Sequence, residues 1–378
     1  MRWKAGFYYP PSYHYRQPFH ENVRSLLASS DVDYCVYYSE PFGSYKIKKD
    51  TVEIPWGRKV PLLRLGNKGP MLQMAFADVL ASDLVIVQQE NLLLLNYFCQ
   101  MISLAGRQKV AFFGHGRNFQ SRDPHSLAER FKSALATRVD WWFAYTDQTS
   151  KHLQSIGYPA DRITVFNNAV DTSTLRSQAA AVTAERLAIR RAELGLVGSN
   201  TCVYVGGIYP DKRVPFLVEC LDLIRAAVPD FEFVAVGGGV DLPLLEQAAK
   251  DRPWLKVTGP RFGQDKVELM ALGKLFLIPG LVGLAVLDAG VMGLPVVTTD
   301  YPYHSPEIAY LEDGRSGLIV KPWSDAKAYA DAVIGLLGSD RLPAMSEASR
   351  AIAARYTIEA MAERFAEGVL KALAAPPK

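Results

Sequence analysis

The sequence predicts two doubly wound α/β domains, and three of its features lead to this prediction. The chain has 378 residues, roughly two to three times the length of an ordinary domain. Apolar residues make up 49% and charged residues 21%, so the chain can build hydrophobic cores and is not of a disordered class. Short apolar runs alternate with helical patterns along both halves, which is typical of parallel sheets covered on both faces.

The first half of the chain contains apolar runs that are bounded by turn residues. These runs predict strands at 5–9, 33–38, 84–88, 109–114, 141–146 and 163–166. Helical patterns lie between them, at 21–29, 70–81, 91–104, 126–137 and 148–155. We therefore expect a first domain at residues 1–178.

The second half repeats this alternation. Strands are predicted at 201–205, 232–236, 255–258, 275–278, 295–298 and 317–320. Helices are predicted at 214–226, 242–250, 264–272, 285–291 and 325–337. A segment rich in Ala, Arg and Glu at 178–200 predicts a helix that opens this domain. We expect a second domain at residues 179–360 and a helix at 361–378 that packs back on the first domain.

The composition argues against several other classes of protein. Forty-two basic and 39 acidic residues give a net charge of +3, too balanced for a dedicated nucleic-acid binder. Four scattered cysteines without metal-binding spacing predict free thiols in a reducing compartment. The segment 275–297 is long and apolar enough for a membrane span, but its glycines and prolines favour a strand, a loop, a buried helix and a second strand. The first residues show no signal-peptide pattern, so we expect a cytoplasmic protein.

Basic residues are densest between residues 45 and 68, where they alternate with apolar and aromatic residues. This stretch is either a solvated loop or a surface that contacts anionic lipid headgroups, where each basic residue contributes about 1 kcal/mol. Its basic residues are Lys46, Lys48, Lys49, Arg58, Lys59, Arg64 and Lys68.

Ligands of a doubly wound sheet bind at the carboxyl ends of its strands, so the residues after each strand are candidates. His115 follows the run 109–114 between Gly114 and Gly116, which allow a ligand to approach the backbone closely. The alternative is a histidine that bonds to its own loop. Three residues between the first strand and the first helix are candidates by position alone, and a solvated loop fits them equally well: Tyr13, Arg16 and His20.

Glycine-containing loops follow three strands of the second domain. Residues 206–213 join two glycines and a proline turn to two adjacent cations, a pattern that attracts phosphate, although the P-loop pattern is absent. The glycine run at 237–239 also fits a tight turn in which Asp241 caps a helix. The loop after residue 278 opens a helix that contains Asp288, the only ionisable side chain of its apolar stretch. We expect that carboxylate to bond to a ligand hydroxyl or to a neighbouring loop.

Taken in order, these motifs resemble those of retaining glycosyltransferases of family 4, which have the GT-B fold. The resemblance covers about residues 109–360, whereas the first ~100 residues match only in their strand–helix rhythm. No single motif is specific, but the ordered set is. It comprises His115-Gly116, Asn168-Ala169-Val170-Asp171, Gly206 through Lys212, Gly283 to Asp288, Gly293-Leu294-Pro295-Val296-Val297, Pro306-Glu307 and Asp313-Gly314-Arg315-Ser316-Gly317.

The resemblance implies that the second domain holds a nucleotide-sugar donor and the first a saccharide or lipid-linked acceptor. Lys212 and His115 are the implied catalytic residues: Lys212 would neutralise the diphosphate and His115 would act on the reacting sugar. Asp288 would bind the ribose hydroxyls. The nucleotide sugar is a substrate, and no cofactor or metal is implied. The implied donor-binding residues are Gly207, Lys212, Arg213, Arg261, Phe262, Gly280, Leu281, Val282, Gly283, Leu284 and Asp288.

This sequence departs from the family pattern at two donor-binding positions. Gly280 stands where the family usually has a glutamate that contacts the donor sugar, so we expect an open space there and a missing hydrogen-bond acceptor. Gly207 stands where the family usually has an arginine, and Arg213 is the candidate to supply the missing cation.

The sequence therefore favours a retaining, metal-independent hexosyltransferase that uses a UDP- or GDP-sugar in polysaccharide or glycolipid synthesis. Peripheral contact with the inner face of an anionic membrane is a further expectation, and nucleic acid is not an expected partner. Two alternatives stay open: a non-catalytic GT-B protein that binds a nucleotide or scaffolds a partner, and a UDP-sugar 2-epimerase.

Overall fold

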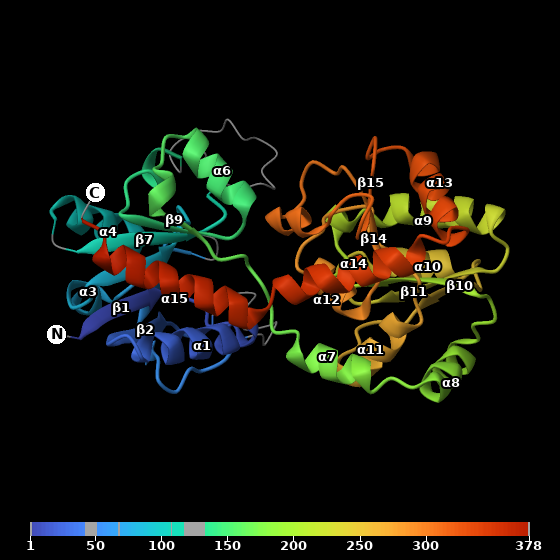
Figure 1. Ribbon diagram of the computed structural model, residues 1–378, viewed down its shortest axis with the longest axis horizontal. Helices are drawn as coiled ribbons and strands as arrows, with labels where there is room; N and C mark the ends of the chain where they lie inside the picture. Colours follow the sequence, from blue (N-terminus) through green and yellow to red (C-terminus); the bar gives the residue numbers. More distant parts are fainter. Residues whose placement is uncertain (1, 42–50, 67–68, 107, 117–132, 377–378) are drawn as a thin grey trace. The chain divides into compact units, whose positions relative to one another are not determined.

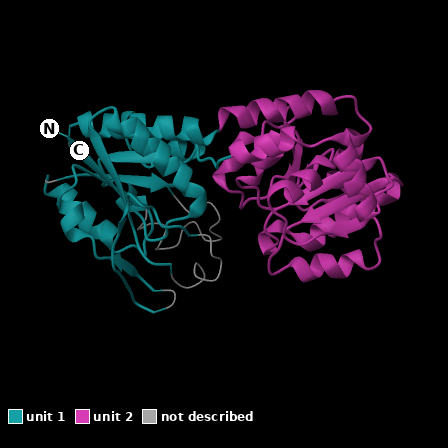
Figure 2. Cartoon of the chain, turned by 90° about the horizontal axis from the view of Figure 1, so that it is seen from below, with its two compact units in different colours: residues 1–171, 357–378 teal, residues 172–356 magenta. Residues whose placement is uncertain are grey.

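The computed structural model describes residues 2–41, 51–66, 69–106, 108–116 and 133–376. The chain divides into two compact units (Figure 2). Unit 1 comprises Met1–Asp171 and Thr357–Lys378, and unit 2 comprises Thr172–Tyr356. Each unit is built around its own sheet, so each has its own core.

Unit 1 contains a parallel sheet with the strand order β3-β2-β1-β6-β7-β8-β9. Its central strands read as continuous apolar runs because helices cover both faces. Val85, Val87 and Phe112 pack with Cys99 and Ile102 of a helix on one face. The strands are β1 (Trp3–Tyr8), β2 (Val32–Tyr38), β3 (Arg58–Lys59), β6 (Leu84–Gln88), β7 (Lys109–Gly114), β8 (Trp141–Ala144) and β9 (Ile163–Val165).

The last helix of the chain, α15 (Ile358–Ala374), belongs to unit 1 (Figure 1). It packs against α1 (Gln17–Ala28) and the strands β6 to β9. Its Phe365 ring contacts the rings of Phe7, Phe19, Phe143 and Phe166, at centroid distances of 4.2 to 6.3 Å. An aromatic cluster therefore joins the two ends of the chain in one core. The other helices of unit 1 are α3 (Phe76–Leu80), α4 (Leu95–Leu104) and α6 (Asp147–Ser155).

Unit 2 contains a second parallel sheet, with the strand order β12-β11-β10-β13-β14-β15. The helices α10 and α13 both contact α9 (Figure 1). In a second group, α11 contacts α7, α8 and α12, and α12 also contacts α7 and α14. The strands are β10 (Asn200–Val205), β11 (Phe231–Val236), β12 (Leu255–Val257), β13 (Phe276–Leu277), β14 (Val296–Thr299) and β15 (Gly317–Val320). The helices are α7 (Ser173–Ala180), α8 (Ala184–Leu194), α9 (Val214–Ala227), α10 (Leu242–Ala249), α11 (Gly263–Ala271), α12 (Ala285–Met292), α13 (Ala326–Leu337) and α14 (Leu342–Arg355).

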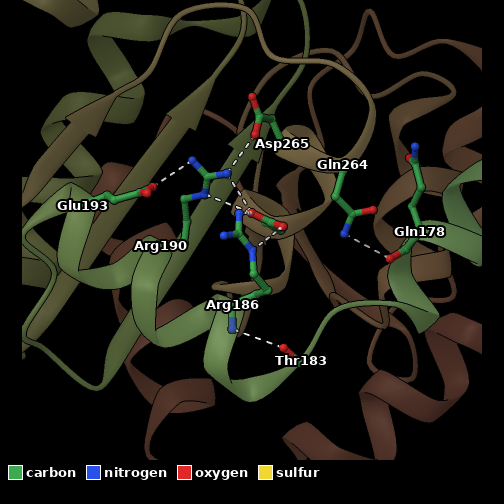
Figure 3. Close-up of polar contacts among 8 residues, drawn as sticks. Gln178, Thr183, Arg186, Arg190, Glu193, Gln264 and Asp265 are labelled. Atoms are coloured by element: carbon green, nitrogen blue, oxygen red, sulfur yellow. Dashed lines mark hydrogen bonds and ion pairs between the residues drawn. The ribbon is translucent and has the colours of Figure 1, made fainter.

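A buried carboxylate holds α8 against α11 (Figure 3). The Glu268 side chain is 3% exposed and accepts hydrogen bonds from Arg186 at 3.0 Å and from Arg190 at 2.7 Å. The bond from Arg186 is the main reason why the pKa of Glu268 lies below its usual value. Arg190 also pairs with Glu193 and Asp265. This network fixes α11, whose first turn follows the loop that carries Arg261 and Phe262.

Several elements differ from the sequence prediction. The expected helix at 70–81 is wrong: Met71–Gln73 forms β5, which pairs antiparallel with β4 (Leu62–Arg64), and only α3 is helical. The residues after Pro70 pair across to β4 instead, with Leu72 opposite Leu63 and Met71 opposite Arg64. The expected helix at 126–137 lies mostly outside the described residues. The single helix expected at 178–200 is two helices, because Thr183 caps a new one by accepting a hydrogen bond from the Arg186 amide.

The division between the units falls at 171/172 and 356/357, where the prediction had 178 and 360. The reason for the first difference is that α7 contacts α11 and α12.

The segment 275–297 holds β13, α12 and the start of β14, as predicted. Among the described residues, no helix combines the length and the apolar character that crossing a membrane requires.

Candidate functional site

Two loops of unit 2 meet at the carboxyl ends of β10 and β13. These strands are neighbours in the sheet, but the chain runs outward from β10 through β11 to β12 before it returns to β13. The pair is therefore the topological switch point, where doubly wound sheets bind their ligands. The loop after β10 ends in a short 3-10 helix, Pro210–Lys212, and the loop after β13 leads into α12.

Lys212 is a buried cation at this point. The residue is 7% exposed, and its ammonium group donates a hydrogen bond to the carbonyl oxygen of Leu281 and lies 5.1 Å from the centre of the Tyr209 ring. Burial lowers the pKa of Lys212 to about 8. Lys212 and the loop after β13 are thus in contact, as the order of motifs predicted.

Gly280 lies against the backbone of the other loop. A Cβ atom at this position would overlap the carbonyl oxygen of Asp211 and would lie 2.8 to 2.9 Å from backbone atoms of Lys212. The amide of Leu281 donates to the same Asp211 oxygen at 2.8 Å. The expectation of an open space at Gly280 is therefore wrong: the backbone of residues 211–212 occupies it.

The backbone amides of the implied donor-binding residues 281–284 differ in their hydrogen-bond partners. Leu281 donates to Asp211, and Val282 donates to Nδ1 of His304 at 3.0 Å. The amides of Gly283 and Leu284 have no acceptor among the residues that the structure describes. These two amides lie at the start of α12, where an anion is stabilised. Leu281 and Val282 shape the loop, and Gly283 and Leu284 are available to a ligand.

His304 holds the loop after β13 in position. Its Nδ1 accepts from the Val282 amide, and its Nε2 lies 2.8 Å from the carbonyl oxygen of Thr299. These two contacts require a neutral ring with the proton on Nε2. Burial, with a smaller contribution from the nearby Lys212, lowers the pKa of His304, which favours the same neutral form. The contact between His304 and this amide was not predicted, because no sequence pattern links residues 282 and 304.

Arg213 does not replace the missing cation. Its backbone has a φ of 58°, in the left-handed region. Its guanidinium donates to the carbonyl oxygens of Pro279 at 3.1 Å and Trp323 at 2.7 Å and lies 3.8 Å from the centre of the Phe216 ring. Arg213 therefore ties the loop to neighbouring segments, and the prediction that it serves the donor has no support in this arrangement.

The glycines after β10 and β11 serve a close approach of two backbones. Gly207 accepts a hydrogen bond from the Tyr204 hydroxyl at 2.6 Å. Side chains at Gly237 and Gly239 would overlap the carbonyl oxygens of Gly206 and Ile208. The run 237–239 is thus a packing feature, and Asp241 precedes α10 without a capping bond from its side chain.

Asp288 pairs with Lys266 of α11, a residue that the sequence analysis did not single out. Their side chains are 27% and 26% exposed, and Oδ2 of Asp288 lies 3.0 Å from the Lys266 ammonium. A lysine on an amphipathic helix carries no sequence signal that distinguishes it from a solvated residue. Nearby in the sequence, Phe262 is 82% exposed and Arg261 bonds only to the Pro260 carbonyl among the described residues.

Unit 1 brings His115 and Arg16 to one aromatic ring. His115 meets the Tyr145 ring edge-on at 4.4 Å, and the Arg16 guanidinium lies 5.8 Å from the centre of that ring. Arg16 also donates to Oδ1 of Asn168 at 2.6 Å. The loops after β7, β8 and β9 and the segment before α1 thus converge, which the sequence predicted for His115 and only suggested for Arg16.

The other two acceptor candidates have different positions. Tyr13 stacks on Tyr15 at a centroid distance of 5.2 Å and is half-buried. His20 is a core residue: it is 5% exposed, its Nδ1 bonds to the Tyr34 hydroxyl at 2.9 Å, and burial lowers its pKa to about 3. The prediction that His20 contacts an acceptor is wrong, because α1 turns this side chain toward Phe7 and Phe19.

The basic stretch at 45–68 lies partly outside the described residues, which exclude Lys46, Lys48, Lys49 and Lys68. Within the described part, Arg58 pairs with Asp78, and Lys59 pairs with Glu40 at 2.5 Å and Glu53 at 2.8 Å. These two cations are therefore neutralised locally.

The two Rossmann-like units define a GT-B fold, and comparisons with known proteins agree. Residues 199–339, which lie within unit 2, match the family model of group 1 glycosyl transferases. Among solved structures, HepE of Anabaena in complex with UDP has a TM-score of 0.71 and 17% identity, with 98% of this chain and 100% of that chain covered. WaaG, a glycosyltransferase involved in lipopolysaccharide biosynthesis, has a TM-score of 0.62 and 17% identity, with 96% and 98% covered.

Curated relatives are also glycosyltransferases. An alpha-D-kanosaminyltransferase of Streptomyces kanamyceticus is 30% identical over 47% of this chain and 48% of its own length. A phosphatidyl-myo-inositol mannosyltransferase of Mycolicibacterium smegmatis is 31% identical over 36% of this chain and 35% of its own. The matches thus span about half or less of these relatives.

Proposed function

We propose that this chain is a retaining, metal-independent glycosyltransferase that takes a hexose from a UDP- or GDP-sugar. The observation that carries the proposal is the contact between Lys212 and the loop after β13. The ammonium of Lys212 bonds to the Leu281 carbonyl, two residues before the available amides of Gly283 and Leu284. A buried cation beside free helix-start amides is suited to a diphosphate.

In the proposed reaction, the bond between the sugar C1 and the diphosphate oxygen breaks. The acceptor oxygen bonds to C1 on the same face, and its proton passes to the leaving diphosphate. Lys212 and the amides of Gly283 and Leu284 stabilise the charge that develops on that leaving group. This work would otherwise need a metal ion.

The proposed acceptor is a hydroxyl of a saccharide or of a lipid-linked molecule. Support for a lipid acceptor comes from the Mycolicibacterium smegmatis relative, which is a phosphatidyl-myo-inositol mannosyltransferase. Support for a uridine nucleotide comes from the Anabaena neighbour, which was solved with UDP and with UDP-glucose.

The test is release of UDP or GDP from a panel of sugar nucleotides, measured with and without EDTA. The expected result is release from at least one donor, insensitive to EDTA. Lys212→Ala should weaken binding of the nucleotide diphosphate about ten- to a hundredfold, since a hydrogen bond to a charged group contributes about 1.5–3 kcal/mol. Lys250→Ala is the matched control, because Lys250 is an exposed lysine of the same unit.

One observation favours a second candidate, a GT-B protein that binds a nucleotide without turnover. At Gly280 the structure leaves no space for a carboxylate on this backbone, so the usual contact to the donor sugar has to come from elsewhere. Binding of UDP or GDP without nucleotide release from any donor would support this candidate over the transferase.

A further inference from the structure

Unit 2 contains a cavity at the amino ends of its strands, whereas the switch point lies at their carboxyl ends. It has a volume of about 730 Å³, within the range of small-molecule sites. Gly273 and Gly293 line it, and they precede β13 and β14, so the cavity lies at the amino ends of these strands. It is therefore separate from the candidate donor site at the carboxyl ends.

The cavity is lined by both apolar and polar groups, and its charged lining residues are all cations. Met292, Leu294 and Leu342 are among the apolar residues. The cations are Arg176, Lys274 and Arg350, and no acidic residue lines the cavity. Such a lining is suited to a ligand that joins an anionic group to an apolar part.

The three cations each bond to an oxygen that carries no charge. Arg176 donates to the Ala353 carbonyl, Arg350 to the Met292 carbonyl and Lys274 to the amide oxygen of Asn200. Within the described residues, none of the three has a carboxylate at ion-pair distance. Carboxylates pair with six other arginines of unit 2, namely Arg186, Arg190, Arg191, Arg252, Arg315 and Arg355. Arg213, Arg225 and Arg341 resemble the cavity cations in bonding to carbonyl oxygens.

The negative ends of helices offset only part of the positive charge of the three cations. The last residues of α7, α11 and α12 (Ala180, Ala271 and Met292) line the cavity, and a helix end carries roughly −0.5 charge. Three such ends amount to roughly −1.5 against three full cations. The first residue of α14, Leu342, adds a positive helix end. The cavity keeps an excess of positive charge that no described carboxylate neutralises.

We propose that this cavity binds one molecule of an amphiphile with a phosphate group. The phosphate contacts Lys274, Arg176 and Arg350 at the rim, and the apolar part lies against Met292 and Leu294. This proposal does not depend on the proposed transferase activity, because no residue of the switch-point loops takes part.

Hexyl phosphate is the probe, and inorganic phosphate and hexanol carry its two parts separately. Methyl-labelled methionine reports binding at the site, with the Met292 signal identified through Met292→Leu. Titrations are run on the full chain with saturating UDP, so that the donor site is occupied. We expect a saturable shift of the Met292 signal with hexyl phosphate, and binding at least about tenfold weaker for either part alone.

The charge requirement is tested with Lys274→Glu, which should weaken hexyl phosphate about tenfold or more. Lys250→Glu is the matched control, because Lys250 is also exposed and also bonds to an amide oxygen, that of Gln247. The affinity of this variant for hexyl phosphate should differ from that of the wild type by less than about twofold. Arg176→Gln is a second variant with the same expected direction, should Lys274→Glu unfold. A Met292 signal that does not move, equal binding of phosphate or hexanol, or full affinity in both cavity variants would each overturn the proposal.

Discussion

The carbonyl oxygen of Asp211 accepts the Leu281 amide at 2.8 Å and, at the same time, fills the space that a side chain at Gly280 would need. The two loops of the candidate site are therefore fitted backbone to backbone. Gly280 is required for this close approach, and its backbone does not have a positive φ. The departure from the family glutamate is thus coupled to the conformation of residues 210–212.

This coupling predicts that a side chain at position 280 destabilises the protein. Gly280→Ala should lower the free energy of unfolding by about 1–3 kcal/mol, because the loops must separate. Gly280→Glu should not increase turnover. Gly283→Ala is the matched control, since its Cβ would meet only the Ser305 side chain at 3.6 Å, an ordinary contact. Chemical unfolding measures both variants, and equal stability of the two would contradict the account.

The lowered pKa of Lys212 predicts a pH dependence of nucleotide binding. A diphosphate favours the charged ammonium, so binding raises the pKa of Lys212 from about 8 and takes up a proton above that pH. The affinity for UDP should fall by up to tenfold per pH unit above pH 8. Calorimetry in several buffers measures both the affinity and the proton uptake.

The variant Lys212→Arg isolates this effect, because arginine stays charged over the whole range. The affinity of this variant for UDP should not change with pH where that of the wild type falls, and a parallel fall in both proteins would assign the dependence to another group.

Without ligand, the unfolded chain holds the Lys212 proton up to about pH 10.5. It therefore binds more protons than the folded chain between pH 8 and 10.5, and this residue makes the free energy of unfolding rise with pH across that window.

The Asp288–Lys266 pair predicts a contact that depends on the ribose. Asp288→Asn should weaken UDP about tenfold and leave pyrophosphate unchanged, because only UDP offers hydroxyls to the carboxylate. Asp265→Asn is the control, as it lies on α11 and pairs with Arg190. Equal losses for UDP and pyrophosphate would show that Asp288 acts through the fold or the general charge.

His115 is predicted to affect turnover and not nucleotide affinity. It belongs to unit 1, whereas the proposed nucleotide contacts are all in unit 2. His115→Ala should lower the rate of sugar transfer by about 10²–10⁴, the span typical of positioned polar groups. His14→Ala changes an exposed histidine of the same unit and should have the wild-type rate. Transfer at the wild-type rate in His115→Ala would remove this residue from the reaction.

Contact with anionic membranes is a further prediction, and it concerns Lys46, Lys48 and Lys49. Co-sedimentation with liposomes should increase with anionic lipid and weaken with salt, because exposed charges are screened. Reversal of the three lysines to glutamate should reduce it. Reversal of Lys151, Lys250 and Lys371, which are exposed lysines outside both proposed sites, provides a control of equal charge. Equal recovery with neutral and anionic liposomes would leave the solvated-loop interpretation.

The buried strands of both sheets were predictable because buried parallel strands are continuous apolar runs, whereas the short exposed edge strand β3 was missed. The bounds of β6, β7 and β15 coincide with the prediction. The β4–β5 pair was not predictable, since an antiparallel edge pair depends on a partner and on the turn before Met71.

At the candidate site, the order of motifs predicted that Lys212 and the loop after β13 lie together. The directions of side chains were not predictable in this way, because they depend on residues far away in sequence. Arg213 turns toward Trp323, which is far away in sequence, and His20 turns into the core. No local pattern records such choices. The same holds for Lys266, whose role depends on the packing of α11 beside α12.

The return of α15 to unit 1 has a consequence for the order in which the protein is completed on the ribosome. Unit 2 is one uninterrupted stretch and can fold as soon as it has been synthesised. Unit 1 lacks Phe365 until almost the whole chain exists, so Phe7, Phe19, Phe143 and Phe166 stay without their common partner. The part that is translated first is therefore finished last. A chain that stops before residue 357 would contain a complete second unit and a first unit with an exposed aromatic face, a state prone to aggregation.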